Sequence, residues 1–200
     1  MSPLKLGVIG IDHRHIFGQL EKMQALGCTC KGWWTEGETE LIESKATRDH
    51  TERMLRGFGV TVRAKSVGTD RHISIQGGQV LSGLEASIPG DPSSAAFLLA
   101  AGMISPKGEV VVENTLSNET RDGFFRAVGL MGGELGAEDI GEAAGEQLID
   151  LQSHSVSLRG VEIPERLVPS MIDEFPILAV VAAFAKGETH IRGADELRVK

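Results

Sequence analysis

The sequence predicts an α/β fold built from repeated strand and helix units. A polar motif, Thr-Arg-Asp followed four residues after the Asp by an Arg, begins at Thr47 and again at Thr120, and each copy opens an amphipathic helix that ends in glycine. A small, apolar helix follows each of these, over about Pro92–Ile104 and over 175–185, and each apolar helix is followed by Lys-Gly and a strand. Such periodicity indicates stacked supersecondary units that bury their apolar faces against one another.

The first 40 residues predict a separate element order. Residues 4–11 are typical of a buried strand that ends in glycines, Asp12 is placed to cap a helix over 13–25, and residues 28–34 suggest a second strand. This strand, glycine turn, helix and strand resemble the first unit of the Rossmann domain in the Gfo/Idh/MocA oxidoreductases, over residues 1–38. Gly7 and Gly10 are present, but the full Gly-x-Gly-x-x-Gly fingerprint is not. An NAD(P)-binding oxidoreductase fragment is therefore one alternative.

The acidic stretch from Thr35 to Ile42 is predicted to be a boundary between this Rossmann-like fragment (1–40) and the rest of the chain. His13 and His15 lack carboxylates or cysteines at ligand spacing, so no metal site is predicted there. Cys28 and Cys30 are too close together for a disulfide framework and are expected to be buried thiols.

Beyond residue 41, short stretches of alternating or apolar residues, bounded by glycine and other turn residues, predict the remaining strands. They are expected at about 60–64, 73–76, 109–113, 147–152 and from 188 onward.

Composition narrows the class of partner. The 200 residues are 41% hydrophobic and 24% charged, with a net charge of −8 and no cluster of Lys and Arg, which argues against a nucleic-acid partner. The sequence shows neither a signal peptide nor a stretch long enough to cross a bilayer, so no membrane partner and a cytoplasmic location are expected. The oligomeric state is not predicted.

The last apolar helix carries the main candidate residue. Ile177 to Ala185 is uninterrupted apolar sequence closed by Lys186 and Gly187, as expected of a buried helix. Asp173 lies just before this helix, where its charge is favoured by the helix dipole. Two interpretations stay open: Asp173 caps the helix, or it faces a cleft as a general base or a ligand contact.

Four segments resemble the EPSP synthase family (3-phosphoshikimate 1-carboxyvinyltransferases), and its glyphosate-tolerant class II branch in particular. They hold the family's order over residues 41–200, at 47–52, 89–97, 170–174 and 196–200. The resemblance implies an α/β fold of two domains, each made of three βαβαββ units with the helices packed inside, an inside-out α/β barrel. Residues 41–88 would be the last unit of one domain, and 89–200 a partial second domain.

The resemblance also implies an activity and its residues. The family transfers the carboxyvinyl group of phosphoenolpyruvate to the 5-hydroxyl of shikimate 3-phosphate in aromatic amino acid biosynthesis, without a metal or organic cofactor. By position, Arg48 would contact the phosphate of shikimate 3-phosphate, Asp173 would contact its hydroxyls and act as a catalytic base, and Lys200 would lie at the reacting centre near both substrates.

Several of the family's other substrate-binding motifs have no counterpart in this sequence. We therefore expect little phosphate release from the polypeptide alone, and a catalytically inactive fusion or remnant is a further alternative.

Overall fold

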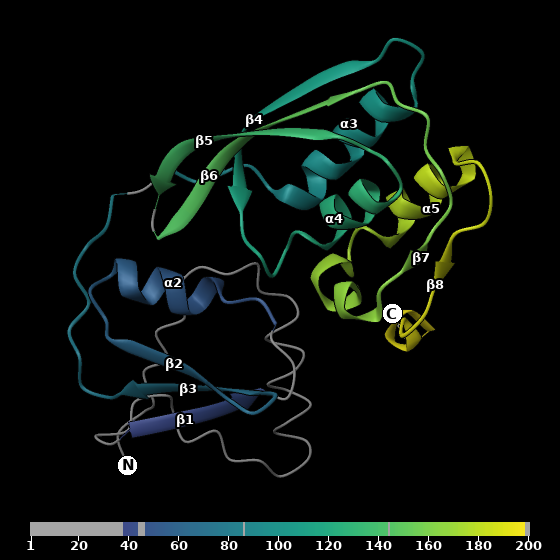
Figure 1. The fold of residues 1–200 in the computed structure, drawn as a ribbon. Coiled ribbons are helices and arrows are strands. Elements are labelled where there is room, and N and C mark those ends of the chain that lie inside the picture. Colours follow the sequence, from purple (N-terminus) through teal and green to yellow (C-terminus); the bar gives the residue numbers. More distant parts are fainter. Residues whose placement is uncertain (1–37, 44–46, 86, 144, 199–200) are drawn as a thin grey trace.

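A computed structural model describes residues 38–43, 47–85, 87–143 and 145–198, which form two lobes (Figure 1). The small lobe holds β1 (Glu38–Glu43), α2 (His50–Gly57), β2 (Val62–Val67) and β3 (Asp70–Gln76), and the large lobe holds every later element. The helix and first two strands predicted before residue 37, the histidines and cysteines there, and Lys200 lie outside the described residues.

The small lobe is an antiparallel sheet in the order β1-β3-β2 with α2 beside it. The described part of the acidic stretch predicted to be a boundary belongs to β1, which runs from Glu38 across residue 40 to Glu43 and pairs with β3 along its whole length. The boundary itself stays a prediction. Side chains on β3 explain why so acidic a strand forms: the His72 ring makes a hydrogen bond with Glu40 at 2.9 Å, and the guanidinium of Arg71 lies 3.4 Å from the Glu43 carboxylate. Opposite charges on paired strands stabilise the pairing.

The large lobe opens with a complete unit of the repeat. Gly90 makes a parallel bridge to Thr115, and then come α3 (Pro92–Ile104), β4 (Glu109–Ser117), α4 (Gly123–Leu130), β5 (Leu135–Ala143) and β6 (Glu146–His154). Its sheet has the order β4-β6-β5, so β4, α4, β5 and β6 match β1, α2, β2 and β3 of the small lobe one for one. The order is βαβαββ, and the predicted repeat is confirmed.

The two equivalent helices end in the same way. Gly59 after α2 and Gly132 after α4 both have positive φ, of 83° and 92°. In each case the following N–H bonds back to the last turn, from Val60 to the Leu55 carbonyl at 2.9 Å and from Gly133 to the Val128 carbonyl at 2.8 Å. A glycine in the left-handed region is what this helix ending requires.

The last part of the large lobe begins a further unit. It comprises β7 (Glu162–Ile163), the 3-10 helix η1 (Glu165–Met171), α5 (Phe175–Phe184), β8 (His190–Ile191) and the 3-10 helix η2 (Asp195–Arg198). β7 and β8 pair in parallel, as strands joined by a helical crossover do. The predicted strand after Lys186-Gly187 is thus present, though only two residues long.

The main core lies between the helices of the large lobe, where α3, α4, η1 and α5 pack together beside the sheet (Figure 1). Met103, Phe124, Met131, Met171 and Leu178 are all fully buried there. α3 and α5 are apolar on all sides, which is typical of helices that lie inside a fold. Within the described residues, no helix has both the length and the apolar character needed to cross a membrane.

Candidate active site

Two of the three predicted site residues meet between the lobes. Arg48 lies just before Asp49, the N-cap of α2. Its Nη2 donates to Oδ2 of Asp173, which precedes α5 in the large lobe, at 2.5 Å. The two residues are 125 positions apart in sequence, so only the tertiary structure brings them together. Lys200, the third, lies outside the described residues.

The N-cap position of α5 is held by Glu174, and Pro176 lies in the first turn as the sequence predicts. Asp173 stands one residue earlier, on the exposed side, with 39% of its side chain accessible. Of the two interpretations of Asp173, the structure therefore favours a residue that faces an open surface rather than the helix cap.

The Arg48–Asp173 pair has the chemistry to bind a phosphorylated, hydroxylated ligand. Among the described residues Arg48 contacts Asp173 alone, and it does so through one of its two terminal nitrogens, so that other donors of its planar guanidinium can take a phosphate. A carboxylate beside it accepts hydrogen bonds from hydroxyl groups and can remove a proton from one of them. The partial exposure of both side chains leaves them accessible to a ligand from solvent.

The equivalent arginine of the repeat makes a different contact. Arg121 donates to Asp91 Oδ1 at 2.8 Å and to Ser93 Oγ at 2.6 Å, within its own lobe. Asp91 is the N-cap of α3 and accepts from the Ser94 N–H at 2.8 Å, as its predicted capping role requires. Burial raises the pKa of Asp91, but the hydrogen bonds from Ser94 and Arg121 outweigh it and hold that pKa below its ordinary value.

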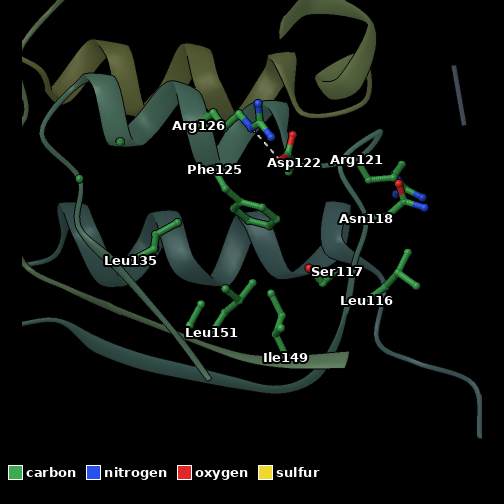
Figure 2. Close-up of a pocket in the computed structure, with 13 residues that line it drawn as sticks. Leu116, Ser117, Asn118, Arg121, Asp122, Phe125, Arg126, Leu135, Ile149 and Leu151 are labelled. Atoms are coloured by element: carbon green, nitrogen blue, oxygen red, sulfur yellow. Dashed lines mark hydrogen bonds and ion pairs between the residues drawn. The ribbon is translucent and has the colours of Figure 1, made fainter. Parts of the chain in front are cut away.

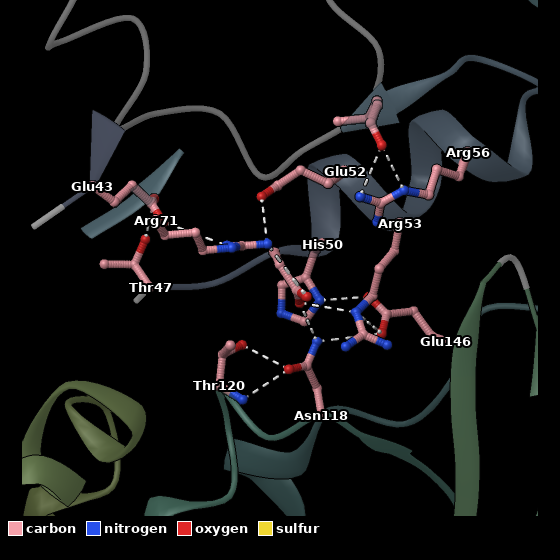
Figure 3. A network of polar contacts seen from close by, with 12 residues as sticks. Glu43, Thr47, His50, Glu52, Arg53, Arg56, Arg71, Asn118, Thr120 and Glu146 are labelled. Atoms are coloured by element: carbon pink, nitrogen blue, oxygen red, sulfur yellow. Dashed lines mark hydrogen bonds and ion pairs between the residues drawn. The ribbon is translucent and has the colours of Figure 1, made fainter. Parts of the chain in front are cut away.

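A polar network joins the lobes through the residues that follow Arg48 in the sequence, and no sequence pattern predicts it (Figure 3). Asp49, His50 and Arg53 at the start of α2 contact Asn118 and Glu146 of the large lobe. The sequence shows the Asp49–Arg53 spacing, but Asn118 and Glu146 carry no motif that would single them out.

A cavity of about 420 Å³ lies between α4 and the sheet of the large lobe (Figure 2). Phe125, Leu135 and Leu151 form its apolar wall, and Asn118, Arg121, Asp122 and Arg126 stand at its polar side. Neither Arg48 nor Asp173 lines it, so this cavity is separate from the candidate site. In the described part of the chain there is no group of three His, Cys, Asp or Glu that could hold a metal ion.

These features define an α/β protein of repeated βαβαββ units with a cation and a carboxylate facing each other between two lobes. A family model described as "EPSP synthase (3-phosphoshikimate 1-carboxyvinyltransferase)" matches residues 28–200. The chain belongs to the EPSP synthase family. The match begins at residue 28, inside the segment 1–38 for which the sequence suggested a Gfo/Idh/MocA oxidoreductase. That resemblance stays a prediction, and residues 28–38 match the EPSP synthase family.

Relatives with this name are similar over most of the chain. A 3-phosphoshikimate 1-carboxyvinyltransferase of Hyphomonas neptunium is 62% identical over 166 residues, which are 82% of this chain and 38% of the relative. One from Caulobacter vibrioides is 50% identical over 173 residues, covering 84% of this chain and 39% of the relative. The solved structure of EPSP synthase from Acinetobacter baumannii superposes with a TM-score of 0.76 at 45% identity, over 84% of this chain and 37% of that one. The chain thus spans about two fifths of the length of these relatives.

Proposed function

We propose that these residues form part of an enzyme that transfers the carboxyvinyl group of phosphoenolpyruvate to the 5-hydroxyl of shikimate 3-phosphate. Membership of the family supports this, and the observation that carries it is the pairing of Arg48 with Asp173 between the lobes. In the reaction the hydroxyl oxygen bonds to the phosphate-bearing carbon of phosphoenolpyruvate as its methylene carbon gains a proton. A proton of the resulting methyl group is then lost as phosphate leaves, which restores the double bond.

In this proposal Arg48 binds the phosphate of shikimate 3-phosphate, since guanidinium and phosphate make charge-assisted hydrogen bonds. Asp173 accepts hydrogen bonds from the ring hydroxyls and takes the proton of the 5-hydroxyl. Lys200, just beyond η2, adds a positive charge at the reacting centre, where it stabilises the anionic substrates. The ion pair seen here orients Arg48 beside the carboxylate, so that phosphate and hydroxyls of one ligand can be bound together.

The class II character of the sequence and the division into domains belong to the same proposal. Residues 41–88 form the end of one domain and residues 89–200 a partial second domain, with the chain crossing between them near Gly90. The separation of the small lobe from the large lobe at this point supports the division.

Calorimetric titration of the 200-residue chain with shikimate 3-phosphate and with shikimate tests the assignment of Arg48. We expect shikimate 3-phosphate to bind at least about tenfold more tightly, because charged hydrogen bonds contribute about 1.5–3 kcal/mol. Arg48→Ala should remove this preference, and Asp173→Asn should weaken both ligands by a similar factor.

Arg126→Ala is the matched control, because it removes the same charge from an exposed pair on α4. It should leave both affinities within about twofold, as expected of a surface pair. Equal affinity for the two ligands in the unaltered chain, or a preference that survives Arg48→Ala, would contradict the proposed function.

A further inference from the structure

Five residues form a clamp between the lobes: Asp49, His50 and Arg53 from the small lobe, and Asn118 and Glu146 from the large lobe. All of them except Asp49 are labelled in Figure 3. Asn118 Nδ2 donates to Asp49 Oδ1 at 2.7 Å and to Glu146 Oε2 at 3.3 Å. His50 Nδ1 lies 2.7 Å from Glu146 Oε1, and Arg53 Nε lies 3.5 Å from Glu146 Oε2. Arg53 Nε also donates to Asp49 Oδ1 at 2.9 Å. Three contacts of the clamp cross between the lobes: Asp49 with Asn118, and His50 and Arg53 with Glu146.

The two residues from the large lobe are buried. Asn118 is 4% exposed and Glu146 8% exposed, and a buried amide or carboxylate destabilises a fold unless it is paired. Asn118 uses both ends of its amide, since its Oδ1 accepts from the Thr120 N–H at 2.8 Å and from the Thr120 hydroxyl at 2.7 Å. Its orientation is thereby fixed from its own lobe before it reaches Asp49.

Within the clamp, Asp49 and Arg53 form a pair of opposite charges. Burial raises the pKa of the Asp49 carboxyl, but hydrogen bonds from Arg53 and Asn118 and the nearby charges of Arg53 and Arg71 outweigh it, so its pKa lies below the ordinary value. The hydrogen bond to Asp49 in turn raises the pKa of Arg53. Both groups are therefore charged in the folded protein at neutral pH.

The backbones of the two lobes also come close together beside the clamp. Gly145, immediately before β6, has a φ of +81°, and a Cβ there would lie 3.0 Å from the carbonyl oxygen of Arg53 in α2. The hairpin between β5 and β6 thus approaches α2 closely enough that a larger residue would be crowded as well as strained.

Among the described residues, the equivalent aspartate–arginine pair in the large lobe lacks the contacts between lobes that the clamp makes. At the equivalent place in the large lobe, Arg126 Nε pairs with Asp122 Oδ2 at 2.7 Å in the same way, but within the described residues no residue of the other lobe joins that pair. The neighbouring arginines differ accordingly: Arg121 binds Asp91 in its own lobe, whereas Arg48 reaches Asp173 in the other.

We propose that Asn118 and Glu146 are positioning residues for Arg48: by holding the first turn of α2 against the large lobe, they set the guanidinium of Arg48 opposite Asp173. Arg48 is the residue immediately before Asp49, so fixing Asp49 from both lobes limits where the Arg48 backbone can lie. This inference rests on the proposed function for its ligand, shikimate 3-phosphate, but the placement of Arg48 can be measured without a ligand.

The first experiment measures the preference for shikimate 3-phosphate over shikimate in Asn118→Ala and in the near-isosteric Glu146→Gln, by calorimetry on the 200-residue chain. A positioning role predicts that the affinity for shikimate 3-phosphate falls about tenfold while that for shikimate changes less than twofold, because only the phosphate depends on Arg48. A general structural role would weaken both ligands together, and that result, or no change for either ligand, overturns the proposal. Asp122→Asn, which alters the equivalent pair in the repeat, should change neither affinity.

The second experiment needs no ligand. Arg48→Cys and Asp173→Cys are combined with Cys28→Ser and Cys30→Ser, and the rate of cross-linking by a short bismaleimide is measured with Asn118 intact and with Asn118→Ala. The clamp predicts cross-linking about fivefold slower in Asn118→Ala, with an unchanged circular dichroism spectrum, and no slowing in Asp122→Asn. Equal rates overturn the clamp. Slower cross-linking in Asn118→Ala, found together with no binding of shikimate 3-phosphate by the unaltered chain that keeps Arg48 and Asp173, supports the clamp and refutes the proposed function instead.

Discussion

Asp49 and Asp122 occupy the same position of the repeat and differ in their surroundings. Each precedes a helix and pairs with the arginine four residues on, at 2.9 Å and 2.7 Å. Asp49 also receives a hydrogen bond from Asn118, and the outcome is a lowered pKa. Burial raises the pKa of Asp122, and the charge of Glu119 adds to this, so that the pair with Arg126 is outweighed. The same residue type thus has opposite pKa shifts in two copies of one motif.

Opposite pKa shifts predict opposite effects on stability. Because the pKa of Asp49 is lower in the folded than in the unfolded chain, its ionised form stabilises the fold above the unfolded pKa, and this contribution is lost as the pH falls through the folded pKa. We expect Asp49→Asn to lower the free energy of unfolding by about 1–2 kcal/mol at pH 7. Urea unfolding at pH 7 and at the lowest pH at which the chain stays folded should show the loss shrinking towards acid.

Asp122→Asn is the matched comparison. The raised pKa means that the ionised carboxylate is disfavoured in the folded chain, so stability is lost as the pH rises through that pKa. Replacing it with a neutral amide should leave the free energy of unfolding at pH 7 within about 0.5 kcal/mol or raise it slightly. A loss at pH 7 as large as that of Asp49→Asn would show that the contact to Asn118 is not what distinguishes the two aspartates.

At the scale of single elements, α4 packs closely against η1 because its first residue is a glycine. Gly123 opens α4 against η1, and a Cβ at this position would lie 2.5 Å from Ser170 Oγ and 2.7 Å from the Leu167 carbonyl oxygen. In the equivalent helix α2 the same position is His50, whose side chain reaches Glu146 of the other lobe. The two helices thus use one position of the repeat for opposite purposes, close packing in α4 and a polar contact in α2.

Two glycines of α4 allow a controlled test of this packing. Gly123→Ala should lower the free energy of unfolding by about 1–3 kcal/mol, because the added methyl overlaps the backbone of η1. Gly129→Ala lies on the same helix with no heavy atom within 4 Å of its Cβ position, and it should stabilise the chain by up to about 1 kcal/mol through helix propensity. Thermal or urea unfolding of the two variants side by side provides the measurement, and a Gly123→Ala chain as stable as the unaltered one would contradict the close approach of η1.

At the scale of the whole molecule, the lobes differ in the core that supports them. Among the described residues, the buried core of the small lobe consists of Val60, Val62 and Ile73, with partly buried apolar residues around it. The large lobe buries apolar side chains from four helical elements. The described part of the small lobe, a three-stranded sheet with so small a core, is marginal by itself, so we expect its stability to depend on its contacts with the large lobe.

Hydrogen exchange measured by mass spectrometry should show this dependence. We expect amides of β1, β2 and β3 to exchange faster than those of β4 and β6, because local opening follows the density of buried apolar contacts. Asn118→Ala should increase exchange further in α2 and the small lobe and leave α3 and α5 unchanged. Uniform exchange across both lobes, or an increase confined to the large lobe, would contradict this division.

Much of the architecture could be predicted from the sequence, because it depends on local patterns. The repeated Thr-Arg-Asp motif predicted two equivalent helices, and the apolar run over Pro92–Ile104 predicted α3 with its N-cap at Asp91. β1 was missed, because the basic residues that neutralise its acidic side chains lie on β3, some thirty residues later. β5 was missed as well, since its sequence, Leu-Gly-Ala-Glu-Asp-Ile-Gly-Glu-Ala, has no apolar alternation and depends on pairing with β6.

The sequence by itself determined the α/β repeat and singled out Arg48 and Asp173 as candidates, since both depend on short motifs. Only the tertiary structure decided that these two side chains meet, and that Asn118 and Glu146 hold the helix next to them. The physical reason is that helix caps, glycine helix ends and apolar runs act over a few residues. Ion pairs between lobes join residues up to 125 positions apart and leave no local pattern.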